Sequence, residues 1–197
     1  KAGSNPIAKE ELLQIKKLAE TNVFHRTKSL GSREDISNEA RKKYVSKILS
    51  FVEVAKIKPY KVVVNSGNGA AGPTFDHIAS DIRKINPAII FERMHHDVDS
   101  SFPNGIPNPI LPETHLRNKK KILASKADFG IAFDGDFDRC FFFDKNGNFV
   151  SGEYIVGLLA EIFLLKEPKA TIVHDSRMVW NVKNIVEFYG GKSVASL

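Results

Sequence analysis

Apolar residues recur at helical spacing in the first quarter of the 197-residue chain. The segments Glu10–Leu18 and Ile36–Val54 place their apolar side chains three and four positions apart, which gathers them on one helix face. The polar segment Asn22–Asp35 between them contains a glycine and lacks this pattern. We therefore expect two amphipathic helices joined by a linker.

From residue 61 onward the pattern changes to short apolar runs rich in β-branched and aromatic residues, which are typical of strands. The predicted strands are Lys61–Asn65, Ala88–Phe91, Phe129–Phe133 and Cys140–Phe143. The helices predicted between them are Pro73–Ile85, with proline at its first position, and Glu113–Ser125. Strands that alternate with helices favour an α/β fold with a parallel sheet covered by helices.

A second α/β run follows Asn146-Gly147, a pair that predicts a hairpin turn. The run comprises a helix at Glu153–Lys166, a strand at Ala170–His174 and a helix at Arg177–Tyr189. Two glycines then end the helix and lead toward another strand. Because the sequence stops at Leu197, we expect a truncated unit with too few strands to cover its helices.

The composition is that of a globular protein, with 42% hydrophobic and 26% charged residues. The single cysteine, Cys140, excludes an intramolecular disulfide, fits the reducing cytoplasm, and is expected in the core. The longest nearly apolar run, Ile155–Leu165, has 11 residues, whereas a membrane span needs roughly 20. The net charge of +6 favours anionic partners such as phosphorylated metabolites, but also serves solubility. Aromatic and basic residues do not interleave, so no nucleic-acid partner is expected.

Three carboxylates at alternate positions, Asp134, Asp136 and Asp138, directly follow the predicted strand Phe129–Phe133. Their mutual repulsion would be relieved by a divalent cation, and oxygen ligands favour Mg²⁺ or Ca²⁺. A solvated turn without a metal is the alternative. An EF-hand is excluded, because arginine and lysine stand where that loop needs glycine and glutamate. Arg139 suits a phosphate, or alternatively an ion pair with a neighbouring aspartate.

The segment Gly67–Gly72 fits the pattern G-x-G-x-x-G between a predicted strand and a predicted helix. Glu92 ends the next strand 20 residues after Gly72, which completes the fingerprint of dinucleotide-binding proteins. An NAD-binding oxidoreductase is therefore one hypothesis. Pro73, however, lacks an N–H at the position where pyrophosphate would bind. The second hypothesis is therefore a tight structural turn, in which the glycines are needed only for the backbone conformation.

Two further polar segments follow strands. His95, His96, Asp97 and Asp99 have metal-ligand chemistry, but we expect them to form a surface loop. The loop with His174, Asp175 and Arg177 follows a predicted strand and carries polar side chains, so it could face a ligand.

Several segments together resemble the α-D-phosphohexomutase superfamily, and within it the bacterial phosphomannomutases. The metal loop Asp-Gly-Asp-Phe-Asp-Arg at 134–139 carries the match most specifically. The longer stretches that match the same family are 64–73, 102–109, 130–140, which includes this loop, 154–161 and 174–181. The resemblance covers nearly the whole chain in order and spacing.

The resemblance implies a three-layer α/β/α domain with a mixed sheet at residues 37–151, carrying the metal loop. Residues 1–36 would be the end of a preceding phosphoserine domain, and residues 152–197 the truncated start of a third. The glycine turn would then be structural, with no dinucleotide bound.

The implied enzyme is a cytoplasmic isomerase of carbohydrate metabolism, leading toward GDP-mannose. It moves a phosphoryl group between the 1- and 6-positions of mannose through a phosphoserine and a hexose 1,6-bisphosphate, which serves as intermediate and activator. One Mg²⁺ would be bound by Asp134, Asp136 and Asp138. Arg139 would be catalytic and hold the phosphoryl group, and Arg177 would contact the phosphosugar. The resemblance gives no oligomeric state and does not separate mannose from glucose.

The family's Ser-His-Asn-Pro nucleophile is absent from the sequence, and Ser4 lies in a segment that does not correspond to it. We therefore expect a fragment that is inactive alone. The alternative is a chain that binds a phosphosugar or a partner protein without catalysis.

Overall fold

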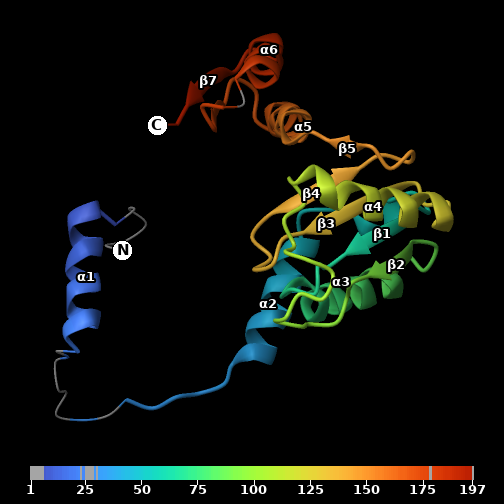
Figure 1. Cartoon of the computed structure of the whole chain (residues 1–197). Helices are drawn as coiled ribbons and strands as arrows, with labels where there is room; N and C mark the ends of the chain where they lie inside the picture. The colour runs from blue at the N-terminus through green and yellow to red at the C-terminus, as the bar shows by residue number, and fades with distance from the viewer. Residues whose placement is uncertain (1–6, 23, 25–28, 30, 178, 197) are drawn as a thin grey trace. The chain divides into compact units, whose positions relative to one another are not determined.

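The computed structural model describes residues 7–22, 24, 29, 31–177 and 179–196 (Figure 1). Ser4 and part of the predicted linker lie outside the described residues. The chain divides into two units, Lys1–Ser37 and Asn38–Leu197. The first contains α1, Lys9–Thr21, whose first turn is closed by the Ala8 N–H donating to Glu11 at 2.9 Å. The amphipathic helix predicted here is confirmed.

The second predicted helix is shorter than expected. α2 spans Ser37–Leu49, whereas the prediction extended to Val54, which instead begins the 3₁₀ turn η1, Val54–Lys56. The amides of Phe51 and Val52 bond three residues back rather than four, and the Ser50 hydroxyl donates to the Lys47 carbonyl at 2.7 Å. These local bonds replace the helical pattern and end α2.

A five-stranded mixed sheet with the order β2-β1-β3-β4-β5 forms the centre of the second unit. Its strands are β1 Lys61–Asn65, β2 Ile90–Met94, β3 Phe129–Phe133, β4 Cys140–Phe143 and β5 Phe149–Val150. β2, β1 and β3 are parallel, and β4 and β5 run antiparallel. The hairpin between β4 and β5 turns at Gly147, where φ is +71°, as the Asn-Gly pair predicts.

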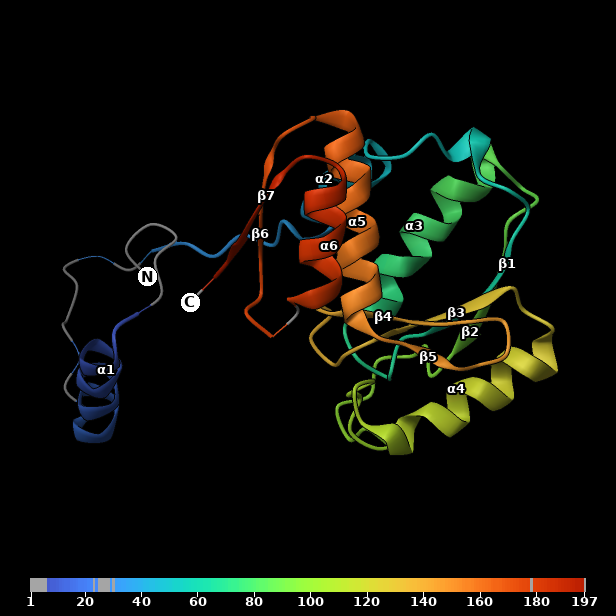
Figure 2. The ribbon, with the colours of Figure 1, turned by 90° about the horizontal axis from the view of Figure 1, so that it is seen from above.

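One helix covers each face of this sheet, α3 Ala71–Ile85 and α4 Pro112–Ser125 (Figure 2). Val62 and Val64 of β1 pack with Phe75 and Ala79 of α3. Val63 points the other way, into a cluster with buried Ile122, Ala127, Ala132 and Phe143. Alternate side chains of one strand therefore enter two cores, and each fully buried apolar side chain contributes about 1.5–3 kcal/mol. The predicted three-layer α/β/α arrangement is confirmed.

Three predicted details are wrong. β2 begins at Ile90 rather than Ala88 and continues to Met94, because Glu92 and Arg93 fit an edge strand through ion pairs with Lys61 and Asp76. α3 begins at Ala71, so its proline is the third helical residue, where the N–H still has no partner within the helix. Cys140 is exposed, because it lies at the open end of β4, beside the acidic loop.

The C-terminal residues form a helix pair and a small parallel sheet. The elements are α5 Gly152–Lys166, β6 Thr171–His174, α6 Trp180–Phe188 and β7 Lys192–Ala195. Ala160, Leu164, Val182 and Val186 form their shared core. α6 begins after Arg177, contrary to the prediction, because the Arg177 amide and guanidinium bind Asp175 in a turn. In the described residues no helix is both long and apolar enough to cross a membrane.

Candidate metal and phosphate site

The loop between β3 and β4 is closed by its own first and last residues. The Asp134 amide donates to the Arg139 carbonyl at 3.4 Å, and the Arg139 amide donates to Oδ1 of Asp134 at 3.0 Å. β3 thus delivers Asp134 to its carboxyl end, which is where ligands gather in open α/β sheets. The turn between Asp134 and Arg139 is short enough to fold three carboxylates toward one point.

Phe137 at the tip of this loop has a left-handed backbone, with φ of +65°. This conformation is costly for a residue with a side chain, so something must hold it. Its ring packs edge-on against Phe133, with centroids 4.8 Å apart, and against Tyr44 of α2 at 6.5 Å. These aromatic contacts anchor the residue that separates Asp136 from Asp138.

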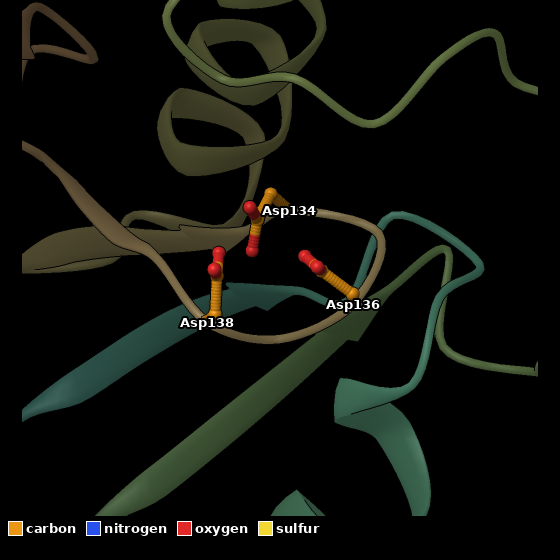
Figure 3. A group of neighbouring side chains, drawn as sticks. All are labelled: Asp134, Asp136 and Asp138. Carbon is orange, nitrogen blue, oxygen red and sulfur yellow. The ribbon is translucent and has the colours of Figure 1, made fainter. Parts of the chain in front are cut away.

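The three aspartates bring their carboxylates together. Figure 3 shows the side chains of Asp134, Asp136 and Asp138 pointing into the loop, and one oxygen of each lies within 4.8 Å of the others. Asp134 is buried, while Asp136 and Asp138 are exposed. Hydrogen bonding to Asp134 and the nearby negative charges raise the pKa of Asp138. This all-oxygen donor set, crowded and electron-rich, fits a hard divalent cation such as Mg²⁺.

Arg139 pairs with the buried member of this group. Its Nε lies 2.6 Å from Oδ2 of Asp134 and 3.4 Å from Oδ1 of Asp138. Burial raises the pKa of Asp134, but hydrogen bonds from Arg139 outweigh it and leave that pKa below its usual value. Among the residues that the structure describes, the Nη atoms of Arg139 make no hydrogen bond, and half of the side chain is exposed. The ion pair weighed as an alternative for Arg139 is therefore present, and it engages Nε rather than the two Nη groups.

The glycine turn does not offer its amides to a dinucleotide. The Gly67 amide donates to the Asn65 side chain, the Asn68 amide to His95, and the Ala70 amide to Gly135. The Gly69 amide donates to Ser66. A pyrophosphate needs these N–H groups free. Their internal bonds contradict the oxidoreductase hypothesis and agree with a structural turn.

The remaining polar residues singled out from the sequence lie elsewhere. His96 binds Asp76 of α3 at 2.9 Å and lies 3.5 Å from the Ser66 hydroxyl. His95 instead lines a cavity of about 330 Å³ together with Arg117 and Phe133. Residues 95–99 form neither helix nor strand, so the predicted loop is confirmed. Across the described ranges, the three loop aspartates are the only grouping with metal-ligand geometry.

Arg177 is held by its own turn. Its Nη2 and Nε lie 2.6 and 2.9 Å from the two carboxylate oxygens of Asp175, and 84% of its side chain is exposed. This contact holds the pKa of Asp175 well below its usual range. His174 is buried and bonds Ser193 of β7 at 2.8 Å, so it fixes the strand end from which this turn projects. A role for Arg177 toward a phosphosugar stays a prediction.

Residues 42–147 match the family model described as phosphoglucomutase/phosphomannomutase, alpha/beta/alpha domain II. The chain belongs to the phosphoglucomutase/phosphomannomutase family. A phosphomannomutase from Vibrio cholerae is 47% identical over 195 residues, which are 98% of this chain and 42% of that protein. This chain therefore spans about two fifths of the length of the curated relatives it matches.

Solved structures with the same fold include a member of this family. A phosphoglucomutase/phosphomannomutase family protein from Burkholderia thailandensis superposes with a TM-score of 0.81 at 27% identity, covering 96% of this chain and 39% of its own. An N-acetylphosphoglucosamine mutase from Aspergillus fumigatus, solved with GlcNAc-6P and magnesium, superposes with a TM-score of 0.61 at 19% identity. That superposition covers 85% of this chain and 37% of the fungal one.

Two residues that shape the metal loop are not evident from the sequence. The positive φ of Phe137 is a property of the folded loop. In the sequence, Gly69 has the pattern of a dinucleotide motif rather than of a contact with the metal loop. The signal available was the pairing of two glycine-containing turns, 66–72 and 134–139, each at the carboxyl end of a parallel strand.

Proposed function

We propose that this chain supplies the metal-binding domain of a phosphomannomutase-type enzyme that interconverts mannose 6-phosphate and mannose 1-phosphate. The observation that carries the proposal is the convergence of three carboxylates within 4.8 Å beside an arginine, in a domain of this family. The Vibrio cholerae relative called phosphomannomutase favours mannose as the sugar. The magnesium named with the fungal mutase favours Mg²⁺ as the cation.

Mg²⁺, when bound, would offset the negative charge of a transferring phosphoryl group. Asp134, Asp136 and Asp138 would hold it, with Asp134 oriented by the Arg139 amide. The Nη groups of the Arg139 guanidinium would donate to phosphoryl oxygens while Nε keeps Asp134 in place. The chain's own residues thus position the charge that a phosphoryl transfer needs, because catalysis of such reactions is largely positioning and electrostatic stabilisation.

The nucleophile is outside these 197 residues. No Ser-His-Asn-Pro segment occurs in the sequence, so the phosphoserine cycle with its hexose 1,6-bisphosphate requires residues from another segment or chain. We expect the isolated chain to show no mutase turnover. Arg177, exposed at the end of β6, would contact the phosphosugar once Asp175 releases part of its bidentate hold.

A segment exchange tests the function directly. The 195 matched residues of the Vibrio cholerae phosphomannomutase are replaced by this chain, and the conversion of mannose 1-phosphate is followed. The exchanged enzyme should turn over, and Asp136→Asn within the inserted segment should lower kcat. Asp97→Asn, an exposed carboxylate outside the metal loop, is the matched control and should leave kcat unchanged.

The result that contradicts the proposal is a folded exchange enzyme whose turnover does not depend on Asp136. Binding of mannose 6-phosphate to the isolated chain, abolished by Arg177→Ala but without turnover in the exchange enzyme, would favour a non-catalytic phosphosugar-binding role instead.

A further inference from the structure

The glycine turn and the metal loop touch each other at Gly135. The Ala70 amide donates to the Gly135 carbonyl at 3.0 Å. A Cβ placed on Gly69 would lie 2.4 Å from that carbonyl oxygen and 2.9 Å from the Gly135 Cα, distances that real Cβ atoms essentially never show. Gly69 does not have a positive φ, so this close approach alone requires glycine there. The two turns therefore fit together with no space for a side chain between them.

The glycine turn is held by hydrogen bonds to the end of β2 and to the segment that follows it. The Ser66 amide donates to the Met94 carbonyl at 3.0 Å, and the Asn68 amide donates to the His95 carbonyl at 2.7 Å. The Asn68 side chain donates to the Asp97 carbonyl at 2.8 Å. Because these bonds tie the turn to the end of β2 and to residues 95–97, it presents a rigid surface to Gly135 rather than yielding to it.

Gly135 is also supported from the proline-rich loop. A Cβ on Gly135 would meet Cγ of Pro107 at 3.2 Å and the ring of Phe102 at 3.7 Å. The same proline lies against the glycine turn, because a Cβ on Gly67 would be 2.4 Å from Cβ of Pro107. Gly135 is thus enclosed by two other loops, and it is the residue that joins Asp134 to Asp136 along the chain.

We propose that Gly69 and Ala70 are positioning residues that set the spacing of the metal-binding carboxylates, and so the size of cation that the loop accepts. The inference rests on the proposed metal-binding function. Displacing the Gly135 carbonyl would rotate the backbone between Asp134 and Asp136. This rotation would increase the distances between the carboxylates of the loop. Mg²⁺ requires near-octahedral ligands at about 2.0–2.1 Å, whereas Ca²⁺ accepts a flexible set at about 2.3–2.6 Å. A widened loop therefore loses Mg²⁺ more than Ca²⁺.

The test compares cation preference in the full 197-residue chain and in Gly69→Ala. Mn²⁺ binding is followed by electron paramagnetic resonance, and Mg²⁺ and Ca²⁺ are titrated as competitors. Gly69→Ala should weaken Mg²⁺ binding by about 10- to 100-fold, the range found for residues that support metal ligands, and weaken Ca²⁺ binding less. Gly31→Ala is the matched control, because no atom lies within 4 Å of its added Cβ. The ratio of Ca²⁺ to Mg²⁺ affinity in this variant should stay unchanged.

A merely structural role for Gly69 would lower stability without changing the preference between cations. If a folded Gly69→Ala protein still binds cations and its ratio of Ca²⁺ to Mg²⁺ affinity is unchanged, this inference is overturned but the proposed metal site is not. No cation binding by the unsubstituted chain overturns the proposed metal site and this inference with it.

A second measurement needs no substitution, in case Gly69→Ala does not fold. Hydrogen exchange of the Ala70 amide in the unsubstituted chain should slow when Mg²⁺ is added, because its acceptor is the loop carbonyl. The Gly31 amide should not respond. Equal exchange at Ala70 with and without bound Mg²⁺ would also overturn the inference.

Discussion

The Nε of Arg139 lies 2.6 Å from Oδ2 of Asp134, and it joins a half-exposed guanidinium to a carboxylate side chain that is only 1% exposed. The same carboxylate accepts the Arg139 amide through Oδ1. Both oxygens of the buried aspartate are therefore satisfied by one residue, five positions along the chain. The pair therefore helps to define the shape of the loop 134–139.

Arg139→Ala should destabilise the apo protein, because it leaves the buried Asp134 carboxylate with only the backbone donor. Loss of a partner from a buried polar group costs about 1–3 kcal/mol, so the urea midpoint should fall. Arg177→Ala is the control, since Asp175, the partner of Arg177, is partly exposed. The urea midpoint of this variant should hardly change. Equal midpoints for the two variants would contradict the structural role of the Arg139–Asp134 pair.

Phe137 offers a test of backbone strain in the metal loop. Both Phe137→Gly and Phe137→Ala remove the ring contacts, but only alanine must keep a side chain at φ of +65°. The glycine variant should therefore have the higher free energy of unfolding, by about 1 kcal/mol, measured by urea denaturation. At Lys145, where φ is not positive, alanine should instead equal or exceed glycine. An alanine variant at 137 as stable as the glycine variant would show that the loop tip is not held left-handed.

The buried pair Asn65–Asn118 links the end of β1 to α4. The Asn65 side-chain amide donates to Oδ1 of Asn118 at 2.9 Å, and Asn118 is 2% exposed. Asn118→Ala should lower the free energy of unfolding by about 1–3 kcal/mol, because it leaves a buried donor without a partner. Lys120→Ala, on the exposed side of the same helix, should change it by less than about 0.5 kcal/mol. Similar urea midpoints for both variants would refute the proposed cost.

Asp76 should give the protein a measurable pH dependence. Burial raises its pKa, but hydrogen bonds from His96 and Arg93 outweigh this and hold the pKa below the ordinary 3.8. Because the folded pKa is depressed, the carboxylate stabilises the fold above pH 3.8, and the contribution is lost as the pH falls through the folded pKa. The gap in unfolding free energy between the unsubstituted chain and Asp76→Asn should therefore shrink with acidification.

The matched control for this titration is Asp81→Asn, whose carboxylate pairs with Lys84 on the surface of α3. Its gap to the unsubstituted chain should be small at every pH. The unfolding free energies of Asp76→Asn and the unsubstituted chain are measured by urea denaturation at a series of pH values. A difference that does not change with pH would contradict the lowered pKa of Asp76.

The central strands were predictable and the edges were not. β1 and β3 have the predicted bounds, because strands flanked on both sides are buried and read as continuous apolar runs. β2 lies at the edge of the sheet, where Glu92 and Arg93 take part through ion pairs that no hydrophobic pattern reveals. The start of α6 was missed for a similar reason, because the turn at Asp175 depends on side-chain bonds.

The candidate site was predictable as far as its chemistry lies in consecutive residues. Alternate aspartates after a strand indicated the carboxylate group, and the structure brings their oxygens together. The supports at Phe137 and Gly69 depend on a backbone angle and on contact with a turn 66 residues earlier, Gly69 against Gly135. Such contacts arise only when distant segments meet at one sheet edge.

Cation binding by the metal loop is the measurement that decides most. Mn²⁺ is titrated into the 197-residue chain and into Asp136→Asn, with Mg²⁺ as competitor and electron paramagnetic resonance as the readout. We predict a single site of modest affinity, on the order of 1 mM or tighter, that Mg²⁺ displaces and that Asp136→Asn abolishes. Binding that survives Asp136→Asn, or no binding at tens of millimolar Mg²⁺, would contradict the assignment of Asp134, Asp136 and Asp138 as a metal site.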